Sequence, residues 1–376
     1  MISDLPIQFL HEPESLPLQK KSLRLMIVAS LAILACFIGN RVRDGFAKTH
    51  SVHLHPSDSV RVLESASVPV RPNAFVFVSF DDSKNEGARN VELNAKRAFS
   101  YLEKICAIGS RTSGTPGMKK QQEMLQEHFE KHGGTVLWQP FDMRHPETGN
   151  RVDINNMVVQ WRPELTQRVM LCTHYDTKPF PANDAKNPRG LFVGANDGGS
   201  GTALFMELAH VMNDLPTKVG VDFVFFDAEE LVYDENRDQF FIGSTYFAQA
   251  YANNPNGTRY RCAILLDMIG DIDLQLQIEK NSFDFARALV EDVWGVAKKL
   301  KVKEFENRMQ GPIRDDHLPL NEIAKIPAID IIDFDYSRGA RSRSFWHTTA
   351  DTPDKCSGAS LVKVGKVLVE WIKQQP

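Results

Sequence analysis

The chain has 376 residues, of which 42% are hydrophobic and 24% are charged. These fractions are ordinary for a globular protein and exclude a largely disordered or fibrous chain. The formal net charge of −4 provides no basic surface for wrapping nucleic acid, so we expect no nucleic-acid partner. Five cysteines without a CxxC spacing are too few for a disulfide scaffold.

The first apolar segment is Leu25–Gly39, which has no charged side chain and has basic residues on both sides. It is shorter than the ~20 residues that a spanning helix usually needs, but no nearby domain is available for it to pack against. We expect residues 1–24 to be a short tail and 25–39 an uncleaved signal anchor. This single-pass membrane helix would hold the rest of the chain outside the cytoplasm. A cleaved signal, giving a secreted protein, and a soluble helix remain alternatives, although residues 36–40 form a poor cleavage site.

Residues 40–90 contain scattered polar residues and prolines with one strand-like run, Ala74–Phe80, and we interpret them as a stalk. From residue 91, helical and strand-like patterns alternate, and several strands are continuous apolar runs that require cover on both faces. We therefore predict an α/β domain over 91–376, a three-layer α/β/α sandwich with a mixed, mostly parallel central sheet. The expected helices are Val91–Ile108, Pro116–His132, Gly199–Met212, Phe283–Leu300 and Ala359–Ile372. The expected strands are Thr135–Gln139, Ile154–Gln160, Val169–Cys172, Val221–Phe226, Cys262–Leu266 and Ala328–Ile332.

Polar residues gather directly after these strands or in the loops between elements. Ligands of open α/β sheets bind outside the carboxyl ends of the strands, so these residues are the site candidates. Each has an ordinary alternative taken singly: an aspartate before a helix can be an N-cap, adjacent glutamates can be a solvated face, and a lone histidine can be a loop residue. The candidates are His174, Asp176, Asp197, Asp227, Glu229, Glu230, Asp267, Asp315, Asp316, His317 and His347.

Together these side chains supply the nitrogen and oxygen ligands that suit zinc. Of the pair Glu229 and Glu230, one can ligate the metal while the other works as a general base, because one carboxylate cannot do both. Motifs of competing chemistries are absent: the sequence has no GxSxG elbow, no Walker loop and no GxGxxG opening a helix after a strand.

Five motifs in this order resemble the zinc aminopeptidase clan with the co-catalytic α/β/α fold. The similarity extends from Ile108 to Trp371 and rests on His174-Tyr175-Asp176, Asn196–Gly201, Asp227–Glu230, Leu265–Gly270 and Trp346–Thr348. The clan contains aminopeptidases, which bind two zinc ions and hydrolyse an N-terminal peptide bond. It also contains glutaminyl-peptide cyclotransferases, which bind one zinc and cyclise N-terminal glutamine to pyroglutamate.

Three features resemble the cyclotransferases and favour that branch. Residues 315–319 match their Asp-Asp-His-x-Pro signature, Trp346 directly precedes His347, and a long loop, Leu231–Gly243, follows the glutamate pair. Other features resemble the aminopeptidases, namely residues 197–201 and 347–352. The aromatic residue usual in the loop of cyclotransferases is not evident, and Glu235 stands near its place.

The resemblance implies a role for each residue in a one-zinc cyclotransferase. Asp197, Glu230 and His347 would bind the zinc, and Glu229 would be the general base and acid. Asp267 and Asp315 would hold the substrate amine, with Asp316 as a substitute for Asp315. Trp346 would form a wall of the glutamine pocket. The ligand-orienting groups would be Asp176, Asp227, Asp316 and His317. The substrates would be peptides or proteins with N-terminal glutamine.

The aminopeptidase alternative would use the same residues with two zinc ions. His174 and Asp267 would bind the second ion, Asp197 would bridge the two, and Glu229 would activate a water. A catalytically inactive binding domain is disfavoured, because all the metal residues are present. No feature of the sequence indicates an obligate partner, so we expect a monomeric catalytic domain.

Overall fold

The computed structural model describes residues 92–334 and 344–376. The expected tail, signal anchor and stalk lie outside these ranges, so the membrane anchor stays a prediction. In the part of the chain that is described, no helix combines the length and hydrophobicity that crossing a bilayer requires.

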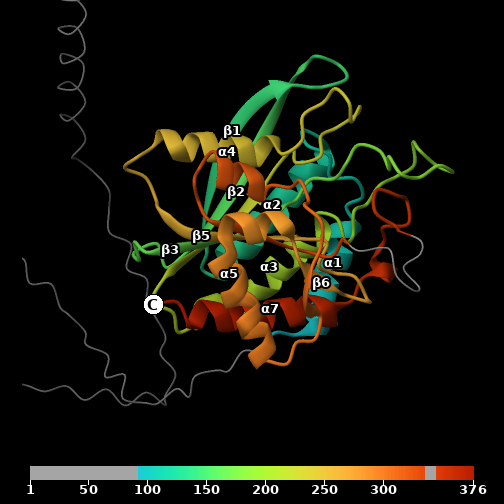
Figure 1. Ribbon diagram of the computed structural model, residues 1–376. Helices are drawn as coiled ribbons and strands as arrows, with labels where there is room; N and C mark the ends of the chain where they lie inside the picture. Colours follow the sequence, from blue (N-terminus) through green and yellow to red (C-terminus); the bar gives the residue numbers. More distant parts are fainter. Residues whose placement is uncertain (1–91, 335–343) are drawn as a thin grey trace, which may run out of the picture. The chain divides into compact units, whose positions relative to one another are not determined.

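A six-stranded mixed sheet forms the centre of the domain, with strand order β1-β2-β4-β3-β5-β8 (Figure 1). The parallel strands β4, β3, β5 and β8 are neighbours, while β1 and β2 pair antiparallel with each other and β2 pairs antiparallel with β4. The strands are β1 Thr135–Arg144, β2 Arg151–Trp161, β3 Arg168–His174, β4 Gly220–Phe226, β5 Tyr260–Asp267 and β8 Ala328–Ile332. A separate two-stranded sheet consists of β6 Leu276–Ile278 and β7 Phe305–Met309.

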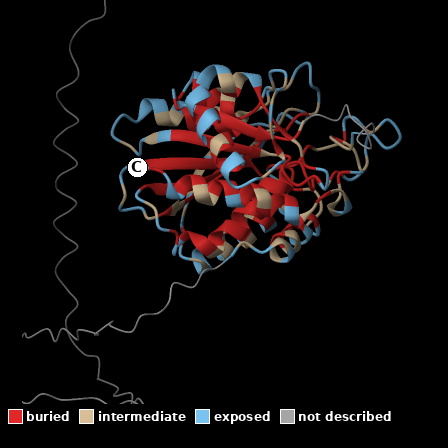
Figure 2. Ribbon diagram, turned by 60° about the horizontal axis from the view of Figure 1, so that its bottom comes forward, coloured by how far each residue is buried: buried red, intermediate tan, exposed pale blue. Residues whose placement is uncertain are grey.

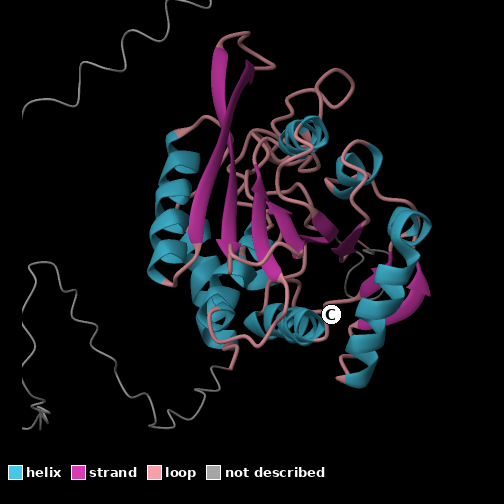
Figure 3. Cartoon of the chain, turned by 90° about the vertical axis from the view of Figure 1, so that its left-hand side faces the viewer, coloured by secondary structure: helices cyan, strands magenta, loops and turns pink. Residues whose placement is uncertain are grey.

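Helices cover both faces of the sheet (Figure 3). Successive residues of β3 show why: Val169 and Leu171 belong to the core under α1, α2, α3, α5 and α7, whereas Met170 and Cys172 belong to the core under α4 and α6. Side chains alternate across a strand, so both faces of β3 must be apolar, and the whole strand is buried (Figure 2). The helices are α1 Ala95–Cys106, α2 Pro116–Lys131, α3 Gly199–Met212, α4 Ile242–Asn253, α5 Lys280–Lys299, α6 His317–Glu322 and α7 Gly358–Lys373.

The predicted three-layer sandwich with a mixed, mostly parallel sheet is confirmed, and most predicted elements lie within a few residues of their observed bounds. The first helix begins at Ala95 rather than at 91, because Asn94 caps it by accepting from the backbone N–H of Arg97. Strand β1 continues five residues past the predicted Gln139, through Pro140. Proline is tolerated there because β1 is an edge strand. The sequence patterns did not predict α4, α6, β6 or β7.

The four cysteines in the described ranges are buried free thiols. They are Cys106, Cys172, Cys262 and Cys356. The described part of the domain is therefore held by its apolar cores without a covalent cross-link.

Candidate functional site

The predicted residues converge at one edge of the sheet because of its topology. His174 and Asp267 are the last residues of β3 and β5, and Asp227 directly follows β4. These three strands are parallel neighbours, so their carboxyl ends meet. Asp197 lies two residues before α3, the helix that follows β3 in the chain.

Asp197, Glu230 and His347 form a buried cluster with ligand atoms within 4.8 Å of one another. His347 Nε2 lies 3.4 Å from Asp197 Oδ2 and 3.1 Å from Glu230 Oε2. The second oxygen of Glu230 accepts from the backbone N–H of Lys178 at 2.6 Å, which fixes the direction of that carboxylate. The resemblance to the zinc aminopeptidase clan implies this same set as the zinc ligands.

His174 lies beside this cluster, between two carboxylates. Its Nε2 is 3.2 Å from Asp197 Oδ1 and 3.2 Å from Asp267 Oδ1. Its Nδ1 faces Glu229 Oε2 at 3.8 Å. The structure thus brings together the second set, which the resemblance implies for a two-zinc enzyme, with Asp197 shared between the two sets.

Asp176 holds the glutamate pair through the backbone. Its Oδ1 accepts from the N–H of Glu229, and its Oδ2 accepts from the N–H of Glu230, each at 3.1 Å. The loop that follows β4 returns to the same place, because the N–H of Phe241 donates to the carbonyl oxygen of Glu229 at 2.9 Å. The bend before the pair is tight, with Ala228 at a φ of 56°. Both glutamates therefore have fixed backbones.

Replacing Asp176 with asparagine is expected to lower kcat by about 10- to 100-fold, the usual loss when a group that orients metal ligands is removed. The amide has one acceptor oxygen, so one of the two glutamate N–H groups would face an NH₂ donor. Asp153→Asn, at an exposed position of β2, is the matched control. Zinc affinity by chelator competition should weaken together with kcat in Asp176→Asn. Unchanged values of both would show that Asp176 does not position the glutamates.

Asp197 is not a helix cap. Gly198 is the N-cap of α3, with a φ of 72° and no side-chain capping bond. The backbone N–H groups of Asn196 and Asp197 instead donate to Asp351, at 2.8 and 3.1 Å. A Cβ at Gly198 would approach the carbonyl oxygen of Asp176 to 2.6 Å, so this turn needs glycine. The N-cap alternative for Asp197 is therefore wrong.

Asp351 and Asp330 are buried acids of the site that the sequence interpretation missed. Asp351 lies four residues after His347, within the motif 347–352. Asp330 lies in the middle of the apolar strand β8. Burial, followed by repulsion from Asp315 and Asp267, raises the pKa of its carboxyl well above the usual range. A single aspartate inside a run of isoleucines was the available signal.

The remaining predicted residues differ in how close they lie to the zinc set. Asp227 accepts from the Ser113 hydroxyl at 2.6 Å and from the N–H of Asn155 at 2.9 Å, which fixes the start of the loop before the glutamates. Asp316 accepts from the Ser244 hydroxyl at 2.5 Å. His317 Nε2 lies 3.4 Å from an oxygen of Glu279, a buried carboxylate outside the zinc set.

Asp315 and Trp346 lie next to the two sets. Burial, followed by repulsion from Asp267, raises the pKa of the Asp315 carboxyl to about 7. The Trp346 ring stacks on His347, with centroids 4.1 Å apart and an angle of 27° between the planes. It also meets Phe334 edge-on at 4.9 Å. Trp346 therefore presents an apolar surface directly beside a predicted zinc ligand.

The residues fit a zinc ion, as the charge balance shows. Buried charges require a partner or a metal. Burial raises the pKa values of Glu229, Glu230 and Asp267, and repulsion from neighbouring carboxylates raises them further. Asp197 Oδ2 is buried without a hydrogen-bond donor. A divalent cation would balance these charges and occupy that oxygen, and the mixture of one imidazole and two carboxylates suits zinc.

An acid-rich zinc centre at the strand ends of a helix-covered sheet is characteristic of the zinc aminopeptidase-like class. The sequence profile of peptidase family M28 matches residues 156–372. The chain belongs to peptidase family M28.

Similar proteins of known structure divide between two activities. A glutaminyl cyclase from Fimbriiglobus ruber is 40% identical, with a TM-score of 0.71 over 82% of this chain and 100% of that one. A structure described as a leucine aminopeptidase precursor, from Bacteroides thetaiotaomicron, is 30% identical, with a TM-score of 0.69 over 76% of this chain and 98% of that one. Among curated proteins, the mouse glutaminyl-peptide cyclotransferase-like protein is 24% identical and covers 75% of this chain and 76% of its own.

Proposed function

We propose that this protein is a zinc-dependent glutaminyl-peptide cyclotransferase, which converts N-terminal glutamine of peptides or proteins to pyroglutamate and releases ammonia. The observation that carries the proposal is the buried Asp315 beside Asp267, next to a complete Asp-Glu-His zinc set. Asp315 begins the signature that the sequence shares with cyclotransferases. The 40% identity to a glutaminyl cyclase over that protein's whole length supports the same branch.

The reaction requires one proton transfer around an intramolecular ring closure. The substrate's α-amine nitrogen bonds to its own γ-carbonyl carbon, the bond from that carbon to the amide nitrogen breaks, and ammonia leaves. Glu229 takes a proton from the amine and returns it to the leaving nitrogen. Asp267 and Asp315 hold the amine near the carbonyl, which makes the attack effectively intramolecular and well oriented. Trp346 excludes water from one side of the glutamine side chain.

One zinc per chain is proposed for this chemistry, held by Asp197, Glu230 and His347. When bound, it polarises the γ-carbonyl as a Lewis acid. His174 then remains a hydrogen-bonding partner of Asp197 and Asp267 rather than a metal ligand.

A two-zinc aminopeptidase is the second candidate, and one observation favours it. His174 Nε2 lies 3.2 Å from both Asp197 and Asp267, so a second set of ligands is already assembled. In that reaction Glu229 would activate a water for hydrolysis of the first peptide bond.

The two candidates are separated by their products. The full chain is incubated with a Gln-initiated and a Leu-initiated peptide, and the products are weighed. We expect loss of ammonia from the Gln peptide and an untouched Leu peptide, with activity lost to a chelator and restored by zinc. Release of free leucine would establish the aminopeptidase, and activity that survives full metal removal would contradict both.

A further inference from the structure

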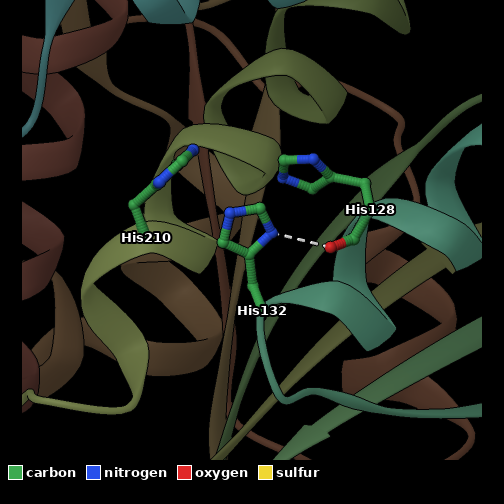
Figure 4. A group of neighbouring side chains, drawn as sticks. All are labelled: His128, His132 and His210. Atoms are coloured by element: carbon green, nitrogen blue, oxygen red, sulfur yellow. Dashed lines mark hydrogen bonds between the residues drawn. The ribbon is translucent and has the colours of Figure 1, made fainter. Parts of the chain in front are cut away.

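Three histidines form a second cluster, remote from the site described above. His128 and His132 lie at the C-terminal end of α2, and His210 lies in the last turn of α3 (Figure 4). Asp197 stands just before the other end of α3. At 1.5 Å per residue, the helix separates the two places by about 20 Å.

The rings are close enough to share one ion. One ring nitrogen from each histidine lies within 4.8 Å of those of the other two. His128 is in the last turn of α2 and His132 is the C-cap residue of that helix, so the two rings lie on the same side, with centroids 4.4 Å apart. His210 reaches the same space from α3, 4.3 Å from the His132 centroid.

One nitrogen of each ring is also held by a hydrogen bond to a backbone carbonyl or a hydroxyl. His132 Nδ1 donates to the carbonyl oxygen of His128 at 2.7 Å, which leaves the lone pair on Nε2. His128 Nε2 donates to the carbonyl oxygen of Met206 at 2.8 Å. His210 Nε2 shares a hydrogen bond with the Tyr101 hydroxyl at 2.7 Å. Backbone carbonyls and hydroxyls of this kind orient histidines in metal sites.

The rings are suited to accept a metal at neutral pH. Burial lowers the pKa of His128 and of His210 to about 4, so both imidazoles are neutral, as ligation requires. The cations near these rings are Lys104 and Arg97 on α1 and Lys131 at the end of α2, and Arg97 is itself paired with Glu207. These cations weaken metal binding, and no carboxylate belongs to the cluster.

We propose that His128, His132 and His210 form a second transition-metal site that takes Zn²⁺ or Cu²⁺ independently of the catalytic centre. Three imidazoles select borderline metals over Mg²⁺ and Ca²⁺, which prefer oxygen ligands. Zinc–nitrogen bonds of about 2.0–2.1 Å place tetrahedral ligands about 3.4 Å apart, so the rings close by roughly 1 Å through side-chain rotation. The bound ion ties the end of α2 to the end of α3.

The test counts metal on the full chain. Wild type and the double variant His132→Gln/His210→Asn are stripped, dialysed against Zn²⁺ and analysed for zinc per chain. We expect wild type to bind one equivalent more than the double variant, while both form product from the same substrate at equal rates. Equal zinc content in the two proteins would overturn the proposal. Mg²⁺ in place of Zn²⁺ should give no difference.

A second histidine group in the sequence requires a matched control. His50, His53 and His55 lie outside the described residues, so His53→Ala/His55→Ala is assayed in parallel and should keep the extra equivalent. Loss of that equivalent in this control alone would overturn the assignment to α2 and α3.

Spectroscopy and melting separate a metal site from a purely structural stack of rings. The electron paramagnetic resonance spectrum of wild type with Cu²⁺ should show hyperfine coupling to three nitrogen ligands. The set of Asp197, Glu230 and His347 supplies only one nitrogen ligand. Saturating Zn²⁺ should raise the Tm of wild type by a few degrees more than that of His132→Gln/His210→Asn. The double variant could have a lower Tm than wild type in chelator, while Zn²⁺ raises the Tm of both proteins by the same amount. In that case the cluster is structural and the proposal fails.

Discussion

Changing Glu229 to glutamine is expected to lower kcat by about 10²- to 10⁴-fold, the range of a positioned general acid–base. Glutamine has nearly the same shape, but it cannot accept the amine proton. The backbone bonds of residue 229 to Asp176 and Phe241 do not involve the altered carboxylate. KM and zinc content should therefore stay close to those of wild type.

Ammonia release, zinc content and Tm are measured together for Glu229→Gln. The control is Glu291→Gln, an exposed glutamate on α5 that pairs with Arg287. A variant that loses zinc along with activity would indicate that Glu229 is a ligand. A variant within about tenfold of wild type in kcat would remove Glu229 from the proposed proton transfer.

A second large effect is expected far from the chemistry, at the buried ion pair between Arg168 and Asp222. Arg168 begins β3 and donates to Asp222 on the neighbouring strand β4, where both side chains are buried. The guanidinium also donates to the carbonyl oxygens of Arg162 and Leu165, at 2.8 and 2.9 Å. Tyr260 on β5 donates its hydroxyl to the same aspartate at 2.6 Å. Three central strands and a loop therefore meet at one pair of charges.

Arg168→Met is expected to lower the free energy of unfolding by about 3–5 kcal/mol, because Asp222 would be left buried without a cation. For a domain of this size the Tm should fall by roughly 10 °C. The double variant Arg168→Met/Asp222→Leu removes both charges and should recover part of the loss. The kcat of the protein that remains folded should not change. An unchanged Tm for Arg168→Met would mean that water or another group compensates Asp222.

The fold could be predicted largely because its central strands are apolar on both faces. Helix α3 was predicted at its observed bounds, since its apolar run begins at a glycine turn and ends before a polar loop. Short elements were missed because they contain too few residues to show a periodic pattern. Helix α6, for example, has only 6 residues. The edge strand β1 was predicted too short, because Pro140 is compatible with a strand only at an edge, and edges are not visible in a sequence.

The site was predictable where polar residues follow apolar strands, as His174, Asp227 and Asp267 do. Asp330 could not be found by that rule, because it lies inside a strand, and its relation to Asp315 depends on how β8 is placed in the sheet. His128 and His132 show a helical pair spacing in the sequence. Their third member, His210, becomes a neighbour only when α2 and α3 pack together.

The four buried thiols affect how this domain can be produced and monitored. Burial raises the pKa of Cys106 to about 11 and that of Cys262 to about 12, so neither is a reactive thiolate in the folded domain. The described fold does not depend on oxidation, and a reducing bacterial cytosol is therefore compatible with its assembly. Cys172 lies in the core under α4 and α6, and Cys356 lies in the core on the other face of the sheet. Alkylation of each native thiol therefore reports local opening at its own place, without an engineered cysteine.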